Sequence, residues 1–356
     1  MTPSSRPTIA ITMGDPLGIG PEVVVKALAD RALRGAARFV IYGQNDVLAW
    51  TAERLGIEPF WFRVAARSER AHEAIFNDCV VLDFHEIELE IASAPRSSRS
   101  GGAISKTCVE EAITDALRQP GDPRRVDAVV TGPISKESWS LAGFRWPGHT
   151  ELLAHRTKAK RHAMMFVSPR LKVALATAHM PLMDIRNVLT IGRVFDPIDL
   201  GHEFCRELGI ARPRIAVAGL NPHAGEHGLF GDEEERLIAP AIEVARRGGI
   251  DVHGPLPGDT VFIGAAAGRY DLVVAMYHDQ GLIPVKLLGW DKAVNVTVGL
   301  PIVRTSPDHG TAFDIAGQNK ASEGSMRAAI ELAVTLVARR GKIDADARGE
   351  RGRVAG

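Results

Sequence analysis

The sequence has few cysteines, no net charge and no motif for a standard phosphate loop, and each absence excludes a class of protein. The three cysteines, Cys79, Cys108 and Cys205, are odd in number, widely spaced and include no CxxC pair. This excludes a disulfide framework and a cysteine zinc ribbon. The 43 Lys and Arg residues balance 43 Asp and Glu residues, so the basic field that attracts nucleic acid or anionic membrane is missing. We therefore expect no nucleic acid and no membrane partner.

Long apolar runs are also missing. No run reaches the roughly 18 residues that a membrane-spanning helix requires. Residues 1–7 are polar, and no apolar stretch of the kind found in an export signal follows them. Together with the unpaired cysteines, these features predict a soluble protein of the reducing cytoplasm.

Short β-rich runs alternate with longer helical patterns along most of the chain, which predicts an α/β fold with a largely parallel sheet. The length of 356 residues is large for one core, so we expect two lobes. Helices are predicted at 22–29, 103–118, 232–247 and 325–339, with loss of order after about Ile343. The predicted strands are 8–13, 38–42, 79–82, 127–131, 172–176, 214–218 and 271–276.

Three histidines directly follow predicted strands: His179, His223 and His278. In an open α/β sheet the carboxyl ends of the strands form the usual ligand-binding edge. Imidazole is the commonest metal ligand, and a catalytic zinc site typically uses three protein ligands and leaves one position open. A metal centre and separate histidines that hydrogen bond at strand ends are both open interpretations of this pattern. Asp259 and Asp279 add carboxylates that are candidates for orienting a ligand or for proton transfer.

Two segments have the features of an anion site at the start of a helix. Ser135 and Lys136 follow a predicted strand and open a helix, and His149 and Thr150 begin another. Ordinary N-capping by Ser135 and Thr150 is the alternative. Neither segment is a Walker P-loop, because no GxxxxGK[ST] is present.

A glycine-rich turn, Gly14-Asp-Pro-Leu-Gly-Ile-Gly-Pro-Glu22, follows the first predicted strand. It contains no GxGxxG, so a Rossmann interpretation is excluded and a tight connection between strand and helix is the alternative. Near the other end of the chain, Lys286 and Arg304 are cations suited to carboxylate or phosphate. The polar segment 309–319 has too specific a composition for a generic connector.

Taken together, these segments resemble the 4-hydroxythreonine-4-phosphate dehydrogenases of pyridoxal phosphate biosynthesis, over nearly the whole chain. The resemblance implies a homodimer with a divalent metal near the dimer interface, in a site that both subunits complete. It implies that His179, His223 and His278 are the metal ligands. It also assigns a small phosphorylated substrate to His149, Thr150, Lys286, Asn295 and Arg304, with Ser135 and Lys136 as further candidates. The motifs that carry it are 14–22, 131–136, 148–151, 219–226, 277–281 and 304–311.

The family is in turn similar to the isocitrate and isopropylmalate dehydrogenases, whose cofactor loop reads much like the segment 309–317. This similarity implies two α/β/α lobes with a cleft between them and a nicotinamide nucleotide bound without a Rossmann motif. By analogy, residues 1–130 with 293–356 form an outer lobe, and 131–292 form a dimer-facing lobe. The absence of an arginine pair in the loop favours NAD over NADP. The cofactor residues so implied are His309, Gly310, Thr311, Ala312, Asp314 and Asn319.

The activity that the resemblance implies is oxidation of the 3-hydroxyl of 4-phosphooxy-L-threonine by NAD. Loss of carbon dioxide then gives 3-amino-2-oxopropyl phosphate. A dication held by neutral imidazoles would stabilise the negative charge that develops in both steps. Lys286, Asp259 and Asp279 are the candidate bases. The ion is left open among zinc, cobalt and magnesium, since imidazoles suit the first two and magnesium prefers oxygen ligands.

Two alternatives remain from the sequence. The first is a sister dehydrogenase that acts on 4-phospho-threonate or 4-phospho-erythronate, where a hydroxyl replaces the amine and the motifs hardly change. The second is a metal-dependent phosphate-ester hydrolase, in which the histidines hold a hydrolytic ion and no nucleotide binds.

Overall fold

The computed structural model describes residues 6–72, 77–90, 94–146 and 148–354, with 342–354 described by their backbone alone. The chain forms two compact units, Met1–Lys158 with Pro301–Gly356, here the terminal unit, and Ala159–Leu300, here the central unit. The lobes expected from the sequence, 1–130 with 293–356 and 131–292, have the same discontinuous pattern and different boundaries.

The segment after residue 130 stays with the terminal unit because its first helix packs closely on that unit. Helix α5 (Lys136–Leu141) lies against α4 (Arg99–Ala116). A Cβ atom added to Gly102 of α4 would lie 1.9 Å from the Ser138 carbonyl oxygen, so only glycine permits this approach.

All strand pairs of the terminal unit are parallel within the part of the chain that is described. Four of its strands are completely buried, as expected for a parallel sheet that is covered on both faces. In order across the sheet they are β3 (Phe62–Ala65), β4 (Cys79–Asp83), β2 (Arg38–Gly43), β1 (Thr8–Thr12), β5 (Ala128–Thr131) and β12 (Val303–Pro307).

The strands of the central unit are mixed in direction. β6 is antiparallel to both of its neighbours, β11 and β7, whereas β7, β10, β8 and β9 are parallel to one another. In order they are β11 (Val294–Val298), β6 (Ala163–Val167), β7 (Lys172–Leu175), β10 (Leu272–Ala275), β8 (Arg214–Ala218) and β9 (Asp251–Leu256).

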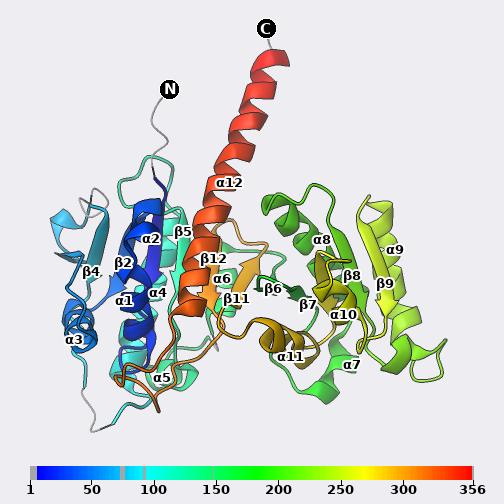
Figure 1. The fold of residues 1–356 in the computed structure, drawn as a ribbon, viewed down its shortest axis with the longest axis horizontal. Helices are drawn as coiled ribbons and strands as arrows, with labels where there is room; N and C mark the ends of the chain where they lie inside the picture. Colours follow the sequence, from blue (N-terminus) through cyan, green and yellow to red (C-terminus); the bar gives the residue numbers. More distant parts are fainter. Residues whose placement is uncertain (1–5, 73–76, 91–93, 147, 355–356) are drawn as a thin grey trace. The chain divides into compact units, whose positions relative to one another are not determined.

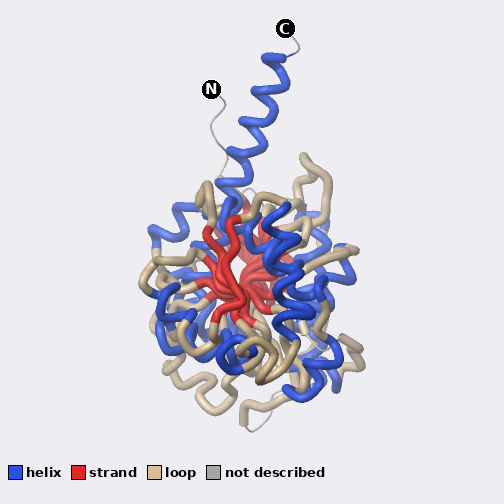
Figure 2. The backbone as a smooth tube through the Cα atoms, turned by 90° about the vertical axis from the view of Figure 1, so that its right-hand side faces the viewer, coloured by secondary structure: helices blue, strands red, loops and turns tan. Residues whose placement is uncertain are grey.

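The helices accompany these strands in both units, and Figure 2 shows strands with helices on both sides. In the terminal unit they are α1 (Gly20–Ala29), α2 (Arg31–Ala36), α3 (Asn45–Leu55), η1 (Glu69–His72), α4, α5, α6 (His149–Thr157) and α12 (Gly324–Val354). In the central unit they are η3 (Leu182–Asp184), α7 (Ile185–Val188), α8 (Ile191–Glu207), η4 (Pro222–Gly225), η5 (Glu234–Ile238), α9 (Ala239–Arg247), α10 (Val261–Ala266) and α11 (His278–Gly289) (Figure 1).

The α/β prediction is confirmed, and each of the seven predicted runs forms a strand. The predicted loss of order after Ile343 is wrong for the backbone, because α12 continues to Val354. Its last residues include Ala, Arg and Glu, which favour helix, and no proline. The helix predicted over 232–247 is divided into the π-helical η5 and α9, since Pro240 at the start of α9 lacks a backbone N–H.

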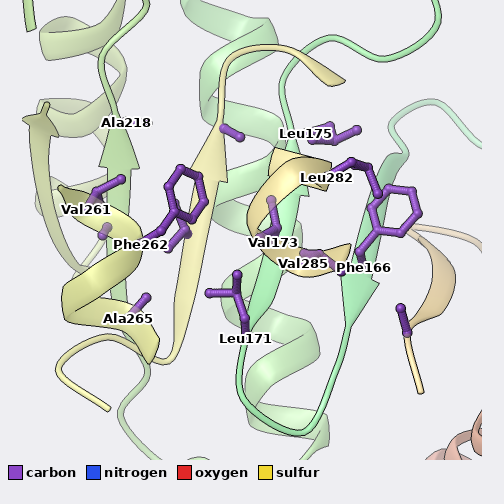
Figure 3. Packing of buried hydrophobic residues seen from close by; sticks show 14 of the residues in the cluster. Phe166, Leu171, Val173, Leu175, Ala218, Val261, Phe262, Ala265, Leu282 and Val285 are labelled. Carbon is purple, nitrogen blue, oxygen red and sulfur yellow. The ribbon is translucent and has the colours of Figure 1, made fainter. Parts of the chain in front are cut away.

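The core of the central unit lies on both faces of its sheet. Phe262 of α10 and Leu282 of α11 pack on Val173 and neighbouring strand residues (Figure 3). On the opposite face α8 approaches β10 so closely that a Cβ atom at Gly201 would lie 2.3 Å from the Leu272 side chain. This packing fixes the strand ends from which the functional loops leave. Among the described residues, no helix is both long and apolar enough to cross a lipid bilayer.

Candidate functional site

The three strand-end histidines leave the same edge of the central sheet. β10 lies between β7 and β8, and all three strands are parallel. His179 follows β7, His223 lies in η4 after β8, and His278 opens α11 after β10. The expectation that these residues share one edge is thus confirmed by the strand order.

Two of these imidazoles lie together and the third has a different neighbour. The ring centroids of His179 and His278 are 5.4 Å apart, whereas His223 lies 6.1 Å from Phe230. Two imidazoles bound to one tetrahedral ion, with metal–nitrogen distances of about 2.1 Å, place their centroids roughly 5 Å apart. The spacing of His179 and His278 therefore fits a shared ion. Within the described ranges, however, no three His, Cys, Asp or Glu side chains of this single chain group closely enough to hold a metal.

A carboxylate adjoins one of the two imidazoles. His278 Nδ1 lies 2.7 Å from Asp279 Oδ1. A carboxylate on one ring nitrogen fixes the tautomer and leaves the other nitrogen for a metal, as second contacts commonly do in metal sites. This geometry favours Asp279 as an orienting residue over its predicted alternative role as a base.

Gln280 ties the histidine loops together, and the sequence prediction did not include it. Its Oε1 accepts a hydrogen bond of 2.7 Å from the Met276 backbone N–H, and its Nε2 donates one of 2.7 Å to the Gly219 carbonyl. One side chain thus connects the ends of β10 and β8. Its place directly after His278 and Asp279 in the Tyr-His-Asp-Gln-Gly motif was the available signal.

The loop that carries His223 is held in an uncommon conformation. His223 and Ala224 have φ angles of 52° each, in the left-handed region that side chains rarely adopt. The buried Glu234 carboxylate accepts hydrogen bonds from the Asn221 backbone N–H at 2.7 Å and from its Nδ2 at 2.9 Å. These bonds offset the backbone strain. Residues in rarely populated backbone conformations often occur at functional sites.

A second cluster lies in the terminal unit, at the ends of β5 and β12. Arg304 on β12 is 2% exposed and donates from Nη2 to Thr131 Oγ1 at 2.7 Å. His149, the first residue of α6, is partly buried beside it, with Trp139 packed edge-on at a centroid distance of 5.4 Å. His149 Nε2 is buried and has no hydrogen-bond partner among the described residues. A buried polar atom without a partner is costly, so this atom indicates a place where a ligand is bound.

The electrostatics of this cluster favour an anion. Burial lowers the pKa of His149 well below its usual value, and the positive charges of Arg304 and Lys136 lower it further. Burial also lowers the pKa of Arg304 to about 10, while Glu151 acts in the opposite direction. Arg304 therefore remains charged at neutral pH beside a neutral imidazole. A bound anion would offset the desolvation of the guanidinium.

The two predicted helix starts differ in their caps. Ser135 caps α5, since its Oγ accepts a 3.0 Å hydrogen bond from the Ser138 N–H, which confirms the capping interpretation for that residue. Thr150 does not cap α6: the N-cap is Gly148, and Thr150 lies inside the first turn. Thr150 and Lys136 are thus placed at the starts of helices beside His149.

The remaining predicted residues of the central unit lie apart from strong polar partners. Asn295 lies on β11 opposite Phe166, and its buried Oδ1 has no hydrogen-bond partner in the described part of the chain. Lys286 on α11 places Nζ 5.3 Å from the centroid of the Trp290 ring. Asp259 is exposed in the loop before α10.

The glycine-rich turn packs against the predicted cofactor loop. The Ile19 backbone N–H donates to the Thr311 carbonyl at 2.9 Å, and a Cβ atom at Gly18 would lie 2.9 Å from the same oxygen. At the far end of the loop, Glu22 Oε1 accepts a 2.9 Å hydrogen bond from the Ala321 N–H. The turn is therefore the tight connection that the sequence predicts, and it also packs along one side of the predicted cofactor loop.

The predicted cofactor loop, residues 309–319, contains a second buried imidazole nitrogen. His309 Nδ1 lies 3.1 Å from the Gly310 carbonyl, and no hydrogen-bond partner of the buried Nε2 is found in the described ranges. Ala312 and Asn319 have positive φ angles, and the Asp314 carbonyl accepts a 2.7 Å hydrogen bond from Gln318 Nε2.

A cavity of about 470 Å³ lies beside this loop, large enough for part of a nucleotide. It is bounded by the turn 16–18, by Trp50 and Arg54 of α3, and by residues 316–319. The sequence prediction did not include Trp50 and Arg54, because only the fold brings α3 to the loop.

Comparison with known proteins identifies similar chains. The profile of the family described as "Pyridoxal phosphate biosynthetic protein PdxA" matches residues 35–333. The chain is 48% identical to D-threonate 4-phosphate dehydrogenase of Salmonella typhimurium, over 92% of this chain and 98% of that protein. It is 45% identical to 4-hydroxythreonine-4-phosphate dehydrogenase of Geobacter metallireducens, over 94% and 96%. The crystal structure of 4-hydroxythreonine-4-phosphate dehydrogenase from Klebsiella pneumoniae is 43% identical, with a TM-score of 0.76, and the match covers 93% of this chain and 99% of that chain.

Proposed function

Because the chain belongs to the family of pyridoxal phosphate biosynthetic protein PdxA, a family of dehydrogenases, we propose that it oxidises 4-phosphooxy-L-threonine with NAD. The 3-hydroxyl carbon loses a hydride to the cofactor, and the resulting β-keto acid loses carbon dioxide to give 3-amino-2-oxopropyl phosphate. The names of the relatives support a dehydrogenase over the phosphate-ester hydrolase.

The observation that carries the proposal is the cluster of Arg304, His149 and Lys136, in which Arg304 is buried. It offers the positive charges of buried Arg304 and exposed Lys136, and the buried His149 Nε2, which has no hydrogen-bond partner among the described residues, in one partly desolvated region. Such a region binds a doubly charged phosphate or a carboxylate more strongly than a solvated surface does. Binding energy from the part of the substrate that does not react would then orient the carbon that does.

The central unit fits a metal ion for the same reaction. His179, His223 and His278 would hold it, and the dication would stabilise the negative charge that develops on the substrate oxygen. Since a single chain brings only two of these imidazoles together, we propose that a second copy of the chain completes the set in a homodimer. Asp279 orients the His278 ring in this arrangement. Lys286 and Asp259 then remain as candidates for removing the hydroxyl proton.

The loop of residues 309–319 and the cavity beside it fit a dinucleotide. The buried His309 Nε2 has no hydrogen-bond partner among the described residues, and because Nδ1–H faces the Gly310 carbonyl, Nε2 of the neutral ring can accept a hydrogen bond from a ligand. NAD, when bound, accepts the hydride. Burial lowers the pKa of His309, so its imidazole is neutral at physiological pH and adds no charge that would select for NADP.

A second substrate is favoured by one specific observation. The D-threonate 4-phosphate dehydrogenase of Salmonella typhimurium is 48% identical to this chain, slightly more than the 45% of the Geobacter metallireducens enzyme. D-threonate 4-phosphate carries a hydroxyl where hydroxythreonine phosphate carries an amine. The same oxidation and decarboxylation would then yield 3-hydroxy-2-oxopropyl phosphate.

Parallel turnover of both substrates tests the proposal. Purified protein is incubated with each acid, NAD or NADP, and zinc, cobalt or magnesium, and NADH or NADPH absorbance, carbon dioxide and free phosphate are measured. We expect NADH and carbon dioxide in equal amounts with hydroxythreonine phosphate, and a higher kcat/KM for it than for D-threonate 4-phosphate. The reverse preference assigns the second substrate. Phosphate release without NADH contradicts both and supports a hydrolase.

A further inference from the structure

Trp50 is an exposed aromatic residue at a cavity. It lies on α3 with 53% of its surface exposed, and it lines the cavity beside residues 316–319 of the cofactor loop. A Cβ atom at Gly317 would lie 3.8 Å from the indole ring, which is ordinary van der Waals contact. A side chain larger than glycine at this position would therefore begin to fill the space beside the ring.

Arg54 fixes this ring relative to the loop. Its guanidinium carbon lies 4.8 Å from the Trp50 ring centroid, and its Nη2 donates a 2.8 Å hydrogen bond to the Gly317 carbonyl. Trp50 and Arg54 are one helical turn apart, so α3 presents both side chains on one face. The indole, the guanidinium and the loop backbone thus form a preorganised wall, which lowers the entropic cost of binding a flat ligand.

We propose that Trp50 stacks on the adenine ring of the dinucleotide and that Arg54 is the residue that positions it. This inference rests on the proposed function for the identity of the ligand. An exposed indole offers a large π surface, and stacking on an aromatic side chain is a general way to bind a nucleobase. The cavity is large enough for an adenosine group.

The adenosine half of the cofactor fits this cavity better than the nicotinamide half does. The nicotinamide ring has to lie against the substrate carbon that loses the hydride. Residues that hold the substrate in the proposal, such as His149, Lys136 and Arg304, do not line the cavity. Its lining includes Asn319, whose amide can donate to and accept from a purine edge, and the apolar side chains of Pro16 and Leu17.

Calorimetric titration with cofactor fragments tests the inference. Trp50→Ala, Trp50→Phe and wild-type protein are titrated with NAD, ADP-ribose and nicotinamide mononucleotide. We expect Trp50→Ala to weaken ADP-ribose and NAD binding by about tenfold, which is typical for loss of one stacked base, and to leave mononucleotide binding unchanged. Trp50→Phe retains an aromatic face and should recover most of the affinity. Phe62→Ala is the matched control, since Phe62 is 62% exposed on β3 and outside the cavity lining.

Arg54→Ala tests the positioning role. We expect KM for NAD to rise by about two- to fivefold, as for loss of an exposed cation–π contact, with kcat unchanged. Arg54→Lys keeps a cation near the ring, so its KM for NAD should lie between those of the wild type and Arg54→Ala. A lower kcat at saturating NAD would contradict a role confined to positioning the adenine site.

The outcomes separate this inference from the proposed function. Equal ADP-ribose affinity in wild type and Trp50→Ala overturns the inference, even if the wild type oxidises hydroxythreonine phosphate. Wild-type protein that binds no ADP-ribose also overturns it. Binding of ADP-ribose that depends on Trp50, in a protein that oxidises neither phosphorylated acid, supports the adenine site and rejects the proposed reaction.

Discussion

The cluster of Arg304, His149 and Lys136 in the terminal unit and the histidine loops of the central unit differ in how their functional groups are held. Arg304 is 2% exposed and lies on the buried strand β12, where its guanidinium reaches Thr131 on the neighbouring strand β5. His179 and His223 are exposed on loops after strands, and the Gln280 and Glu234 side chains hold the backbone of the loop that carries His223.

This difference shows two ways of providing positive charge to an anionic substrate. In the terminal unit the cation is the side chain of Arg304. Its burial strengthens the interaction with an anion, and the strand fixes its position. In the central unit imidazoles on accessible loops suit an ion that is supplied from solution. Substitutions in the cluster around Arg304 should therefore change substrate binding and the pH dependence of stability. Substitutions of the strand-end histidines should change the metal content.

Removing a proposed metal-ligating histidine should have the largest effect. For His179→Ala and His278→Ala we expect loss of the bound metal after dialysis and a fall in kcat of roughly 10³-fold, since the ion contributes several kcal/mol of charge stabilisation. Elemental analysis and NADH absorbance measure the two effects. His253→Ala is the control, because His253 is a half-exposed histidine of the same unit that pairs with Asp251. Unchanged metal content in both variants would show that these rings do not bind the ion.

Removing the buried guanidinium should have the next largest effect. We expect Arg304→Ala to lower kcat/KM by about 10²- to 10³-fold, as when one partner of a buried charge pair is removed. Metal content should stay at the wild-type value, which distinguishes the two clusters. Arg304→Lys keeps the charge and loses the planar fork, so its loss should be smaller. Arg247→Ala, at an exposed ion pair with Glu243 on α9, should leave activity unchanged. Wild-type kcat/KM in Arg304→Ala contradicts the anion site.

The lowered pKa of His149 should have the smallest effect, on stability. Below the ordinary pKa of histidine, the unfolded chain binds a proton at residue 149 that His149 in the folded chain does not bind. The unfolded state is therefore stabilised relative to the folded state as the pH falls. The free energy of unfolding should therefore fall as the pH falls below the ordinary pKa of histidine, by up to about 1.4 kcal/mol per pH unit.

Urea unfolding at several pH values, with wild type and His149→Gln, measures this slope. The variant should lose less stability than the wild type between neutral and mildly acidic pH. His155→Gln, at an exposed position of the same helix, should keep the wild-type slope. Equal slopes in wild type and His149→Gln would indicate that the His149 ring is protonated in the folded protein.

Local sequence predicts the buried parallel strands well and the polar or edge strands poorly. Runs such as Thr8–Thr12 and Cys79–Asp83 are apolar and β-branched, because both faces of their strands are buried. β12 carries Arg304, Thr305 and Ser306 and lacks such a pattern, yet it is buried throughout. Its Thr305 Oγ1 donates to the Ala329 carbonyl of α12, 24 residues further along the chain. Partners at that separation cannot be inferred from a local pattern.

The candidate site shows the same division. The strand-end positions of the three histidines follow from sequence, and the parallel order β7-β10-β8 brings them to one edge. Gln280 and Glu234 were missed because their role depends on backbone atoms of other loops. Trp50 was missed because α3 and the cofactor loop are more than 250 residues apart in the chain.

The sequence by itself determined the α/β alternation, the residues at the strand ends and the family to which the chain belongs. These depend on apolar periodicity and on short motifs, which are local properties of a chain. The tertiary structure alone decided which unit residues 131–158 join, which imidazoles become neighbours, and that His149 is neutral beside a buried Arg304. Burial and proximity between distant segments arise only when the chain packs, and they control desolvation, pKa and the shape of a binding site.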